Sequence, residues 1–498
     1  RTRNSRKNRM SHQLPAILFL LPLFAAISMP VVCLKHRHWS KSISLTILAA
    51  MVLVSILNLH NVIHHGEVRY VFSGWTAPLG IEWVADGLAS IILVLLSALS
   101  LLGVVFTGPT SPKDLGGRIV HYHTLILLLV TSMAGILFAG DLFNLFVFLE
   151  VAAISSYALI GVAGGRALFA AFRYLIVGTL GASFFLLGVS YLYAVTGTLN
   201  MTDMVDRLPL LLNSKALLGG LLFMFIGLGI KMALVPFHSW LPEAYTYAPD
   251  SISPILASLV TKVALLAWVR IIYWVFNASI IINDIPILLL MEVVGALAAV
   301  IGAGLALAQR DIKMMFAYGG ISHIGIILIG IGQGNQTGFA GGVFYLLNDS
   351  VMQAGLFFLA GVAFYQYGVR TIDDIGRVGK QAPWLTGSLI VMAFGMIGLP
   401  PTGGFFGKWY IILGALEAGN YVSVAAVLLS TLLTLAYFVK LFEGIFRQTS
   451  TRLDVQSGEI PLSFKLTLGV TSAAIIILGL FSAPIVQLLL NHALPPSL

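Results

Sequence analysis

The chain has 498 residues, of which 58% are hydrophobic and only 10% are charged. This composition is typical of polytopic membrane proteins and lies far from that of soluble domains, so a soluble enzyme is excluded. The formal net charge is +8, but the Lys and Arg residues follow a membrane topology and do not form one basic patch, so we expect no nucleic-acid partner.

Apolar runs of the length that crosses a bilayer, about 20 residues, follow one another through the whole chain. We predict an all-α polytopic membrane protein with about 14 transmembrane helices. Residues 10–498 then form a single transmembrane domain. The predicted spans lie near residues 13–33, 42–62, 82–106, 120–138, 141–161, 170–196, 217–236, 253–276, 286–308, 313–332, 339–366, 385–413, 421–446 and 464–490.

The first nine residues, RTRNSRKNR, form a basic N-terminal extension in front of Met10. A basic region before an apolar run also suggests a signal peptide. However, no small-residue cleavage site follows, and the run continues into a multi-span chain. We expect Met10 to be the natural start, which peptide mass spectrometry of the native protein would test.

Lys and Arg are distributed unequally between the two sets of predicted loops. The odd-numbered loops and their helix ends hold fifteen, and the even-numbered loops hold three. The positive-inside rule therefore places the odd loops in the cytoplasm and both termini outside. We expect a bacterial or archaeal cytoplasmic membrane. The fifteen are Lys35, Arg37, Lys41, Lys113, Arg118, Arg166, Arg173, Arg310, Lys313, Arg370, Arg377, Lys380, Arg447, Arg452 and Lys465, and the three are Arg69, Arg207 and Lys215.

The sequence offers no pattern for a cofactor or metal. Its single cysteine, Cys33, excludes a disulfide within the chain and an iron–sulfur site made by this chain alone. No Walker A sequence, HExxH motif or GxGxxG turn is present. We therefore expect no cofactor in this chain, so any redox chemistry must come from partner subunits.

Five charged groups fall inside predicted spans, away from their ends: Glu150, Lys231, Lys262, Lys408 and, closer to an end, Glu292. A charge at the centre of a spanning helix costs about 2.5–3.5 kcal/mol on insertion scales. Such residues normally face the bundle interior or water and mark proton or ion pathways. The alternative is a fixed structural ion pair, which becomes less plausible as the number of such groups rises.

Two of the lysines lie beside helix-breaking residues. Lys231 precedes Pro236 in GIKMALVPFHSW, and Lys408 follows Pro400 and Pro401 in GLPPTGGFFGKWYI. Proline lacks an amide proton and clashes with the preceding turn, so we expect both helices to be interrupted within the membrane. Interrupted backbone at this depth is tolerated where protein or a water-filled cavity satisfies it, as in transport sites. A simple proline kink is the alternative at Pro236.

Lys262 and His323 complete the set of candidate relay residues. Lys262 lies among apolar neighbours in LVTKVALL, where its charge depends on a nearby carboxylate. His323, in YGGISHIGII, titrates near neutral pH when unperturbed and is a further candidate for proton transfer. The alternative for His323 is a buried, hydrogen-bonded structural role.

Taken in order, these motifs resemble the antiporter-like subunits shared by respiratory complex I, membrane-bound hydrogenases and Mrp-type cation/proton antiporters. The resemblance covers nearly the whole chain. It rests on GDLFNLFVFLEVAAISSYALI, GIKMALVPFHSWLPEAY, LVTKVAL, RDIKMMFAYGGISHIG and GLPPTGGFFGKWYI. Within the family, the chain is most similar to the D-type subunits of Mrp antiporters, the N-type subunits of complex I and the hydrogenase subunit.

The resemblance implies two inverted five-helix repeats, about residues 120–276 and 286–446, with interrupted seventh and twelfth helices. It also implies that Glu150 pairs with Lys231, that Lys262 is the central relay lysine and that Lys408 is the terminal one. The chain departs from the family in YLLNDSVMQ, where Asp349 and Gln353 occupy positions at which several members carry His and Lys. The roles of Asp349 and Gln353 stay open.

The resemblance implies a proton-translocating subunit of a multisubunit membrane complex, coupled to a redox arm or to cation exchange. The expected partners are other membrane subunits and protons, with Na⁺ or K⁺ as a further transported ion. One alternative is an Mrp-type antiporter subunit with no redox partner, and another is a structural membrane scaffold. The sequence leaves the choice between these functions open.

Overall fold

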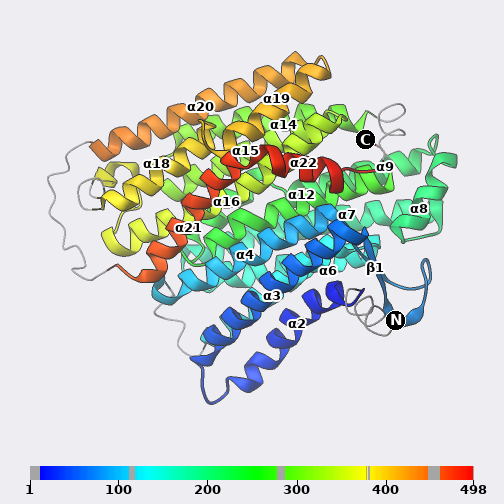
Figure 1. The fold of residues 1–498 in the computed structure, drawn as a ribbon, viewed down its shortest axis with the longest axis horizontal. Helices are drawn as coiled ribbons and strands as arrows, with labels where there is room; N and C mark the ends of the chain where they lie inside the picture. Colours follow the sequence, from blue (N-terminus) through cyan, green and yellow to red (C-terminus); the bar gives the residue numbers. More distant parts are fainter. Residues whose placement is uncertain are drawn as a thin grey trace.

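The computed structural model of the protein describes residues 12–110, 118–276, 286–376, 378, 382–446, 460–496 and 498. The helices run side by side along the long axis of a single bundle (Figure 1). The N-terminal helices α2 and α3 lie along one edge of the bundle in this view, and α20 lies along the opposite edge. The basic segment 1–9 and Met10 lie outside the described residues.

Twelve described segments are long and apolar enough to cross a membrane, and each coincides with a predicted span. The Ser253–Val275 span is built from α11 (Ser253–Ile255), the π-helical turn η5 (Leu256–Val260), α12 (Thr261–Arg270) and the π-helical turn η6 (Ile271–Val275). The others are α2 (Leu14–Val32), α3 (Trp39–His65), α4 (Gly87–Thr110), α5 (Ile119–Phe138), α6 (Leu142–Gly161), α7 (Arg166–Thr196), α14 (Ile287–Ala308), α15 (Ile312–Gly332), α16 (Gln336–Tyr367), α20 (Tyr421–Phe446) and α21 (Leu462–Leu480).

The other two predicted spans, 217–236 and 385–413, are broken helices. The first consists of α9 (Lys215–Lys231), the 3₁₀ turn η4 (Phe237–Trp240) and α10 (Leu241–Tyr247). The second consists of α18 (Pro383–Ile397) and α19 (Gly403–Glu417). Both predicted interruptions are therefore confirmed. The count of fourteen spans and the division into inverted repeats stay predictions.

Two predicted spans differ from the structure at one end. The span predicted at 82–106 begins with a strand, β2 (Glu82–Ala85), and α4 begins only at Gly87. Glu82 and Asp86 mark this change, because their polar groups bond to neighbouring segments. The span predicted at 464–490 is divided at Phe481 into α21 and the shorter α22 (Ser482–His492).

A small hairpin covers one end of the bundle, the end at which α2 begins and α22 ends (Figure 1). Strand β1 (Val68–Val71) pairs antiparallel with β2. The Glu82 carboxylate accepts hydrogen bonds from Asn200 Nδ2 at 3.0 Å and Thr202 Oγ1 at 3.1 Å. The hairpin is thereby fixed to the segment after α7. The short elements beside these helices are η1 (Phe72–Gly74), α8 (Met201–Arg207), η3 (Leu208–Leu210) and η7 (Ile372–Asp374).

Glycines allow α14 and α15 to approach closely. A Cβ placed on Gly325 would lie 2.4 Å from the Gly295 carbonyl oxygen and 2.5 Å from the Ala299 amide nitrogen. Small residues drive such contacts in membranes, where neighbouring helices gain little from the hydrophobic effect. Gly325 is therefore required by packing rather than by its backbone angles.

Replacing Gly325 with Ala should therefore lower the thermal midpoint of the purified protein. Overpacking typically costs about 1–3 kcal/mol, and here the obstacle is backbone that cannot rotate away. The matched control is Gly304→Ala on α14, where a Cβ would meet nothing within 4 Å. The control should be neutral or stabilising, because Ala favours helix over Gly by about 1 kcal/mol. Equal midpoints for both variants would contradict this packing account.

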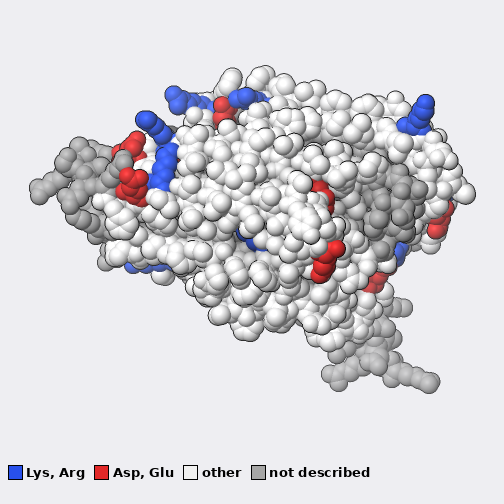
Figure 2. Space-filling view, turned by 90° about the horizontal axis from the view of Figure 1, so that it is seen from above, with Lys and Arg blue, Asp and Glu red and all other residues white. Residues whose placement is uncertain are grey.

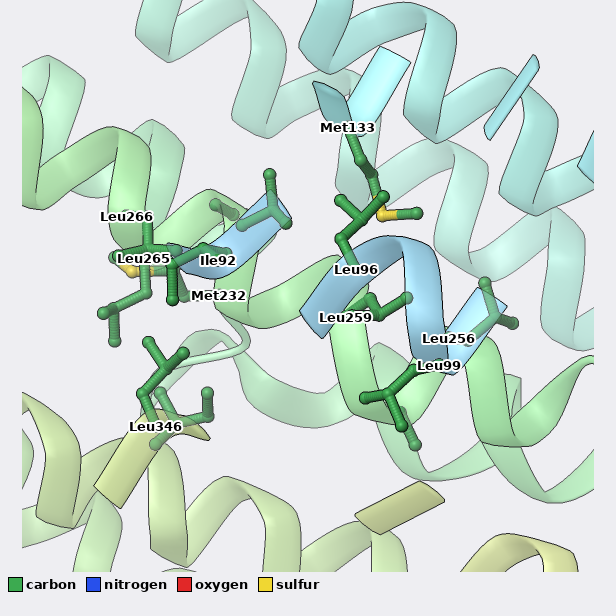
Figure 3. Close-up of a cluster of buried hydrophobic side chains, with 14 of the residues drawn as sticks. Ile92, Leu96, Leu99, Met133, Met232, Leu256, Leu259, Leu265, Leu266 and Leu346 are labelled. Carbon is green, nitrogen blue, oxygen red and sulfur yellow. The ribbon is translucent and has the colours of Figure 1, made fainter. Parts of the chain in front are cut away.

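The centre of the bundle is dry and tightly enclosed. Apolar side chains from α4, α5 and α16 converge on the Ser253–Val275 span, among them Leu96, Met133 and Leu346 (Figure 3). This span and α16 are almost entirely buried. Polar groups on these two helices therefore depend on partners within the protein.

Candidate functional site

The first pair of charged groups joins α6 to the broken helix α9. Lys231 Nζ lies 2.8 Å from Glu150 Oε1 and donates a hydrogen bond to it. The Lys231 side chain is almost fully buried, whereas that of Glu150 is 25% exposed. The ammonium thus has its carboxylate on one side and the protein interior on the other.

The break that follows Lys231 is satisfied by protein groups. Helix α9 ends at Lys231, and Ala233 adopts a left-handed φ of 56°. The indole nitrogen of Trp240 donates to the Ile230 carbonyl at 2.9 Å. The Trp240 ring also stacks on Tyr174 of α7, with 3.8 Å between ring centroids. Unpaired backbone at membrane depth is stabilised in this way, and Lys231 is held at the point where the helix ends.

A second group of charges lies at the bundle centre. Lys262 Nζ is 2.8 Å from Asp349 Oδ2, and His323 Nδ1 is 2.8 Å from Asp349 Oδ1. Lys262 also donates to the Ala257 carbonyl at 2.7 Å, within the π-helical turn η5. Asp349 and His323 are fully buried. One carboxylate therefore serves as counter-ion to a lysine on one helix and as hydrogen-bond partner to a histidine on another.

The terminal lysine, Lys408, is held by the ends of the second broken helix. Its Nζ donates to the carbonyls of Met396 at 2.9 Å and Ile397 at 3.1 Å. These carbonyls lie at the C-terminus of α18, where the helix dipole favours a positive charge. Thr431 Oγ1 of α20 is a third acceptor at 3.2 Å.

Tyr345 of α16 connects the central group with Lys408. Its hydroxyl lies 3.1 Å from His323 Nδ1 and 3.3 Å from Nε2. Lys408 Nζ lies 5.9 Å from the centroid of the same ring. The tyrosine thus contacts the histidine and faces the lysine, although the sequence did not indicate it.

A small cavity separates the first pair from the central group. Its volume is about 20 Å³, and Lys231 lines it together with Val260 and Ala264, which flank Lys262 on the opposite wall. A single water requires about 10–15 Å³ measured in this way. The cavity therefore has room for one water between Lys231 and the helix that carries Lys262.

Residues 139–434, which include every group described above, match a family model described as NADH:quinone oxidoreductase/Mrp antiporter, TM. The match covers more than half of the chain. The chain belongs to this family.

Named relatives within the family include two bacterial proteins and one solved structure. NADH-quinone oxidoreductase subunit N of Desulforudis audaxviator is 38% identical and is aligned over 98% of this chain and 99% of its own. A Na(+)/H(+) antiporter protein of Alkalihalophilus pseudofirmus is 30% identical over 96% of each. A chain of the membrane-bound sulfane sulfur reductase, an archaeal respiratory membrane complex, superposes with a TM-score of 0.88 at 29% identity, over 96% of each chain.

The structure of this family member brings most of the candidate residues together. Glu150 contacts Lys231, and His323 joins Lys262 through Asp349. Lys408 makes no ion pair among the described residues but faces Tyr345. The roles of these residues in proton transfer stay predictions.

Two further polar residues lie apart from these groups. Glu292 is buried near the start of α14 and accepts a hydrogen bond from Asn420, so it does not join the predicted relay. The buried Gln353 packs against Gly320 of α15, and its side chain makes no hydrogen bond to the central group among the described residues. Asp349 is the principal residue that sequence reasoning left without a role. Its signal was available, because an acid in the middle of the apolar run 339–366 is as unusual as Glu150.

Proposed function

We propose that this chain is the proton-translocating subunit of a multisubunit membrane complex. Protons pass between the Glu150–Lys231 pair, the central group of Lys262, Asp349 and His323, and Lys408. The observation that carries the proposal is the central group, in which one buried carboxylate is shared by two protonatable side chains from two other helices. Shared counter-ions allow a proton to move with little rearrangement of heavy atoms.

Electrostatic coupling accounts for movement between the first pair and the centre. A carboxylate at 2.8 Å stabilises the Lys231 ammonium. When Glu150 moves away or is neutralised, the buried ammonium is left without compensation and tends to release its proton. The water-sized cavity beside Lys231 supports a path for that proton toward Lys262.

The face of α6 that carries Glu150 supports the presence of a partner subunit. Phe143, Val147 and Ile154 lie on the same helical face as Glu150 and are exposed. A partly exposed carboxylate among lipid-facing side chains is costly. We infer that a neighbouring membrane subunit covers this face, so that a change in that subunit acts directly on Glu150. Solved relatives such as the sulfane sulfur reductase chain belong to respiratory complexes, which supports this assignment.

The charges also suggest an orientation. Charged side chains are sparse over the middle of the face in Figure 2, as expected for a surface in contact with lipid. Lys313 and Arg370 lie at the same end of the bundle, where both line one pocket. By the positive-inside rule we place this end in the cytoplasm and both termini outside, in a bacterial or archaeal cytoplasmic membrane.

Two kinds of complex are compatible with this site. The relative with 38% identity is named for NADH-quinone oxidation, which favours a redox-driven complex. The antiporter relative at 30% identity supports the second candidate, an Mrp-type Na⁺ or K⁺/H⁺ antiporter without a redox arm. Subunit identification by mass spectrometry of the native complex would separate them. Iron–sulfur subunits indicate the first, and exclusively small membrane subunits indicate the second.

The proposed function is tested by Lys231→Ala in the complex reconstituted into vesicles. We expect proton transport to be lost while the variant protein still assembles, because the ammonium itself is what the relay uses. Assembly is checked by the subunit composition of the purified complex. Transport at the wild-type level would contradict the proposal, whereas loss of assembly together with pH-insensitive residual behaviour would favour a structural scaffold.

A further inference from the structure

The largest polar pocket described in the structure opens at the end of the bundle that we place in the cytoplasm. Its volume is about 230 Å³, and its walls come from the loop before α11, the start of α15 and the last turns of α16. Four charged residues line it: Asp250, Asp311, Lys313 and Arg370. None of them belongs to the relay described above.

One ion pair in the pocket connects the two halves of the chain. Lys313 Nζ, at the start of α15, lies 2.5 Å from Asp250 Oδ1, in the loop before α11. The same ammonium donates to Ser253 Oγ at 3.1 Å and to the Ala248 carbonyl at 3.3 Å. Both charged side chains are more than four-fifths buried. The pair therefore separates the open pocket from the groups behind it.

Polar groups continue from this pair toward Lys262. Ser253 is the first residue of the span that carries Lys262, and its hydroxyl donates to the Tyr245 carbonyl at 2.8 Å. The Tyr245 hydroxyl in turn donates to the Leu256 carbonyl at 3.0 Å, at the start of the π-helical turn η5. The Ala257 carbonyl in that turn holds Lys262. The trail from the pocket ends at the central relay lysine.

The other two charged groups of the pocket have structural partners. The Asp311 carboxylate accepts from the Met314 amide at 3.0 Å and caps α15. The Arg370 guanidinium lies 3.9 Å above the ring of Phe364, and its carbonyl accepts from the Ile312 amide at 3.0 Å. Among the described groups of the pocket, the Lys313–Asp250 pair is therefore the one that can open without unfolding a helix end.

We propose that the Lys313–Asp250 ion pair is a latch that controls the access of protons from this pocket to Lys262. The proposal rests on the proposed function, because it assigns the control of that same relay. While closed, the pair neutralises both charges and blocks the trail. When it opens, water in the pocket reaches Ser253 and Tyr245 and supplies a proton to the central group. Lys313 also lies ten residues before His323 on α15, about 15 Å along the helix, so a shift of α15 moves both.

The latch is tested with Asp250→Asn, Lys313→Gln and the charge-swapped double variant Asp250→Lys/Lys313→Asp. The measurement is the passive proton leak of vesicles that contain the complex, without its energy source. We expect each single variant to raise the leak about tenfold, which corresponds to ~1.4 kcal/mol, and the swap to bring it back toward wild type. The matched control is Glu67→Gln, which removes an exposed 2.9 Å ion pair with Arg69 and should change nothing.

Hydrogen–deuterium exchange in the wild-type complex supplies a second test without mutation. Exchange in residues 253–262 should be faster during turnover than at rest, because opening admits water to this segment. Unchanged exchange, or a wild-type leak in all three latch variants, would overturn the latch. Lys231→Ala separates the two hypotheses. If that variant abolishes transport while the latch variants behave as wild type, the proposed function holds and the latch fails.

Discussion

Replacing Glu150 with Gln is expected to reduce proton translocation by at least about a hundredfold while the complex still assembles. The amide keeps the size of the side chain but removes the charge that stabilises Lys231 at 2.8 Å. Removing one partner of a buried ion pair typically costs about 3–5 kcal/mol, and ~2.7 kcal/mol is already a hundredfold in rate. The measurement is proton uptake by vesicles that contain the purified complex, normalised to the amount of this protein.

Glu292→Gln is the matched control for this experiment. Glu292 is also a carboxylate within a span, but it contacts the neutral Asn420 and lies outside the relay. The control should therefore translocate protons near the wild-type rate. If both variants lose transport equally, a general sensitivity to carboxylate removal explains the result and the specific role of Glu150 is contradicted.

Replacing Asp349 with Asn is expected to impair both stability and transport. Asp349 is fully buried and is the only ion-pair partner of Lys262 among the described residues. Without the carboxylate, the Lys262 ammonium keeps the Ala257 carbonyl as acceptor but has no counter-charge. We expect a loss of about 3–5 kcal/mol, seen as a lower thermal midpoint, together with loss of proton translocation.

A double variant separates the charge from the shape of this site. Lys262→Gln/Asp349→Asn removes both charges, so it should recover much of the stability that Asp349→Asn alone loses. Transport should stay absent, because neither residue can then carry a proton. Recovery of transport in the double variant would show that the central pair is structural.

Much of the membrane architecture could be predicted from the sequence, because apolar runs of spanning length are a strong signal. The breaks near Lys231 and Lys408 were also predictable, since proline and glycine cannot continue an ordinary helix. The position of the first break was not predictable. It begins directly after Lys231, five residues before Pro236, and uses a left-handed Ala233 that no sequence pattern marks.

The central group was harder to predict than the first pair. The resemblance implied the pairing of Glu150 with Lys231, but it offered no acid for Lys262, because Asp349 replaces a different residue in several relatives. Asp349 is 87 residues from Lys262 along the chain and meets it through tertiary packing of α16 against η5. The hairpin was missed for a similar reason. Its short strand EWVA merges with the apolar run that follows, and its partner strand VRYV precedes it by ten residues.

The most direct test of the relay is the number of protons translocated per turnover by the complex that carries Lys262→Gln/Asp349→Asn. This variant keeps the fold but leaves the centre of the path without a titratable pair. The relay predicts that the contribution of this protein to that number is lost, while Lys231 and Lys408 are still present. An unchanged number of protons per turnover, in a complex that contains the variant protein, would contradict it.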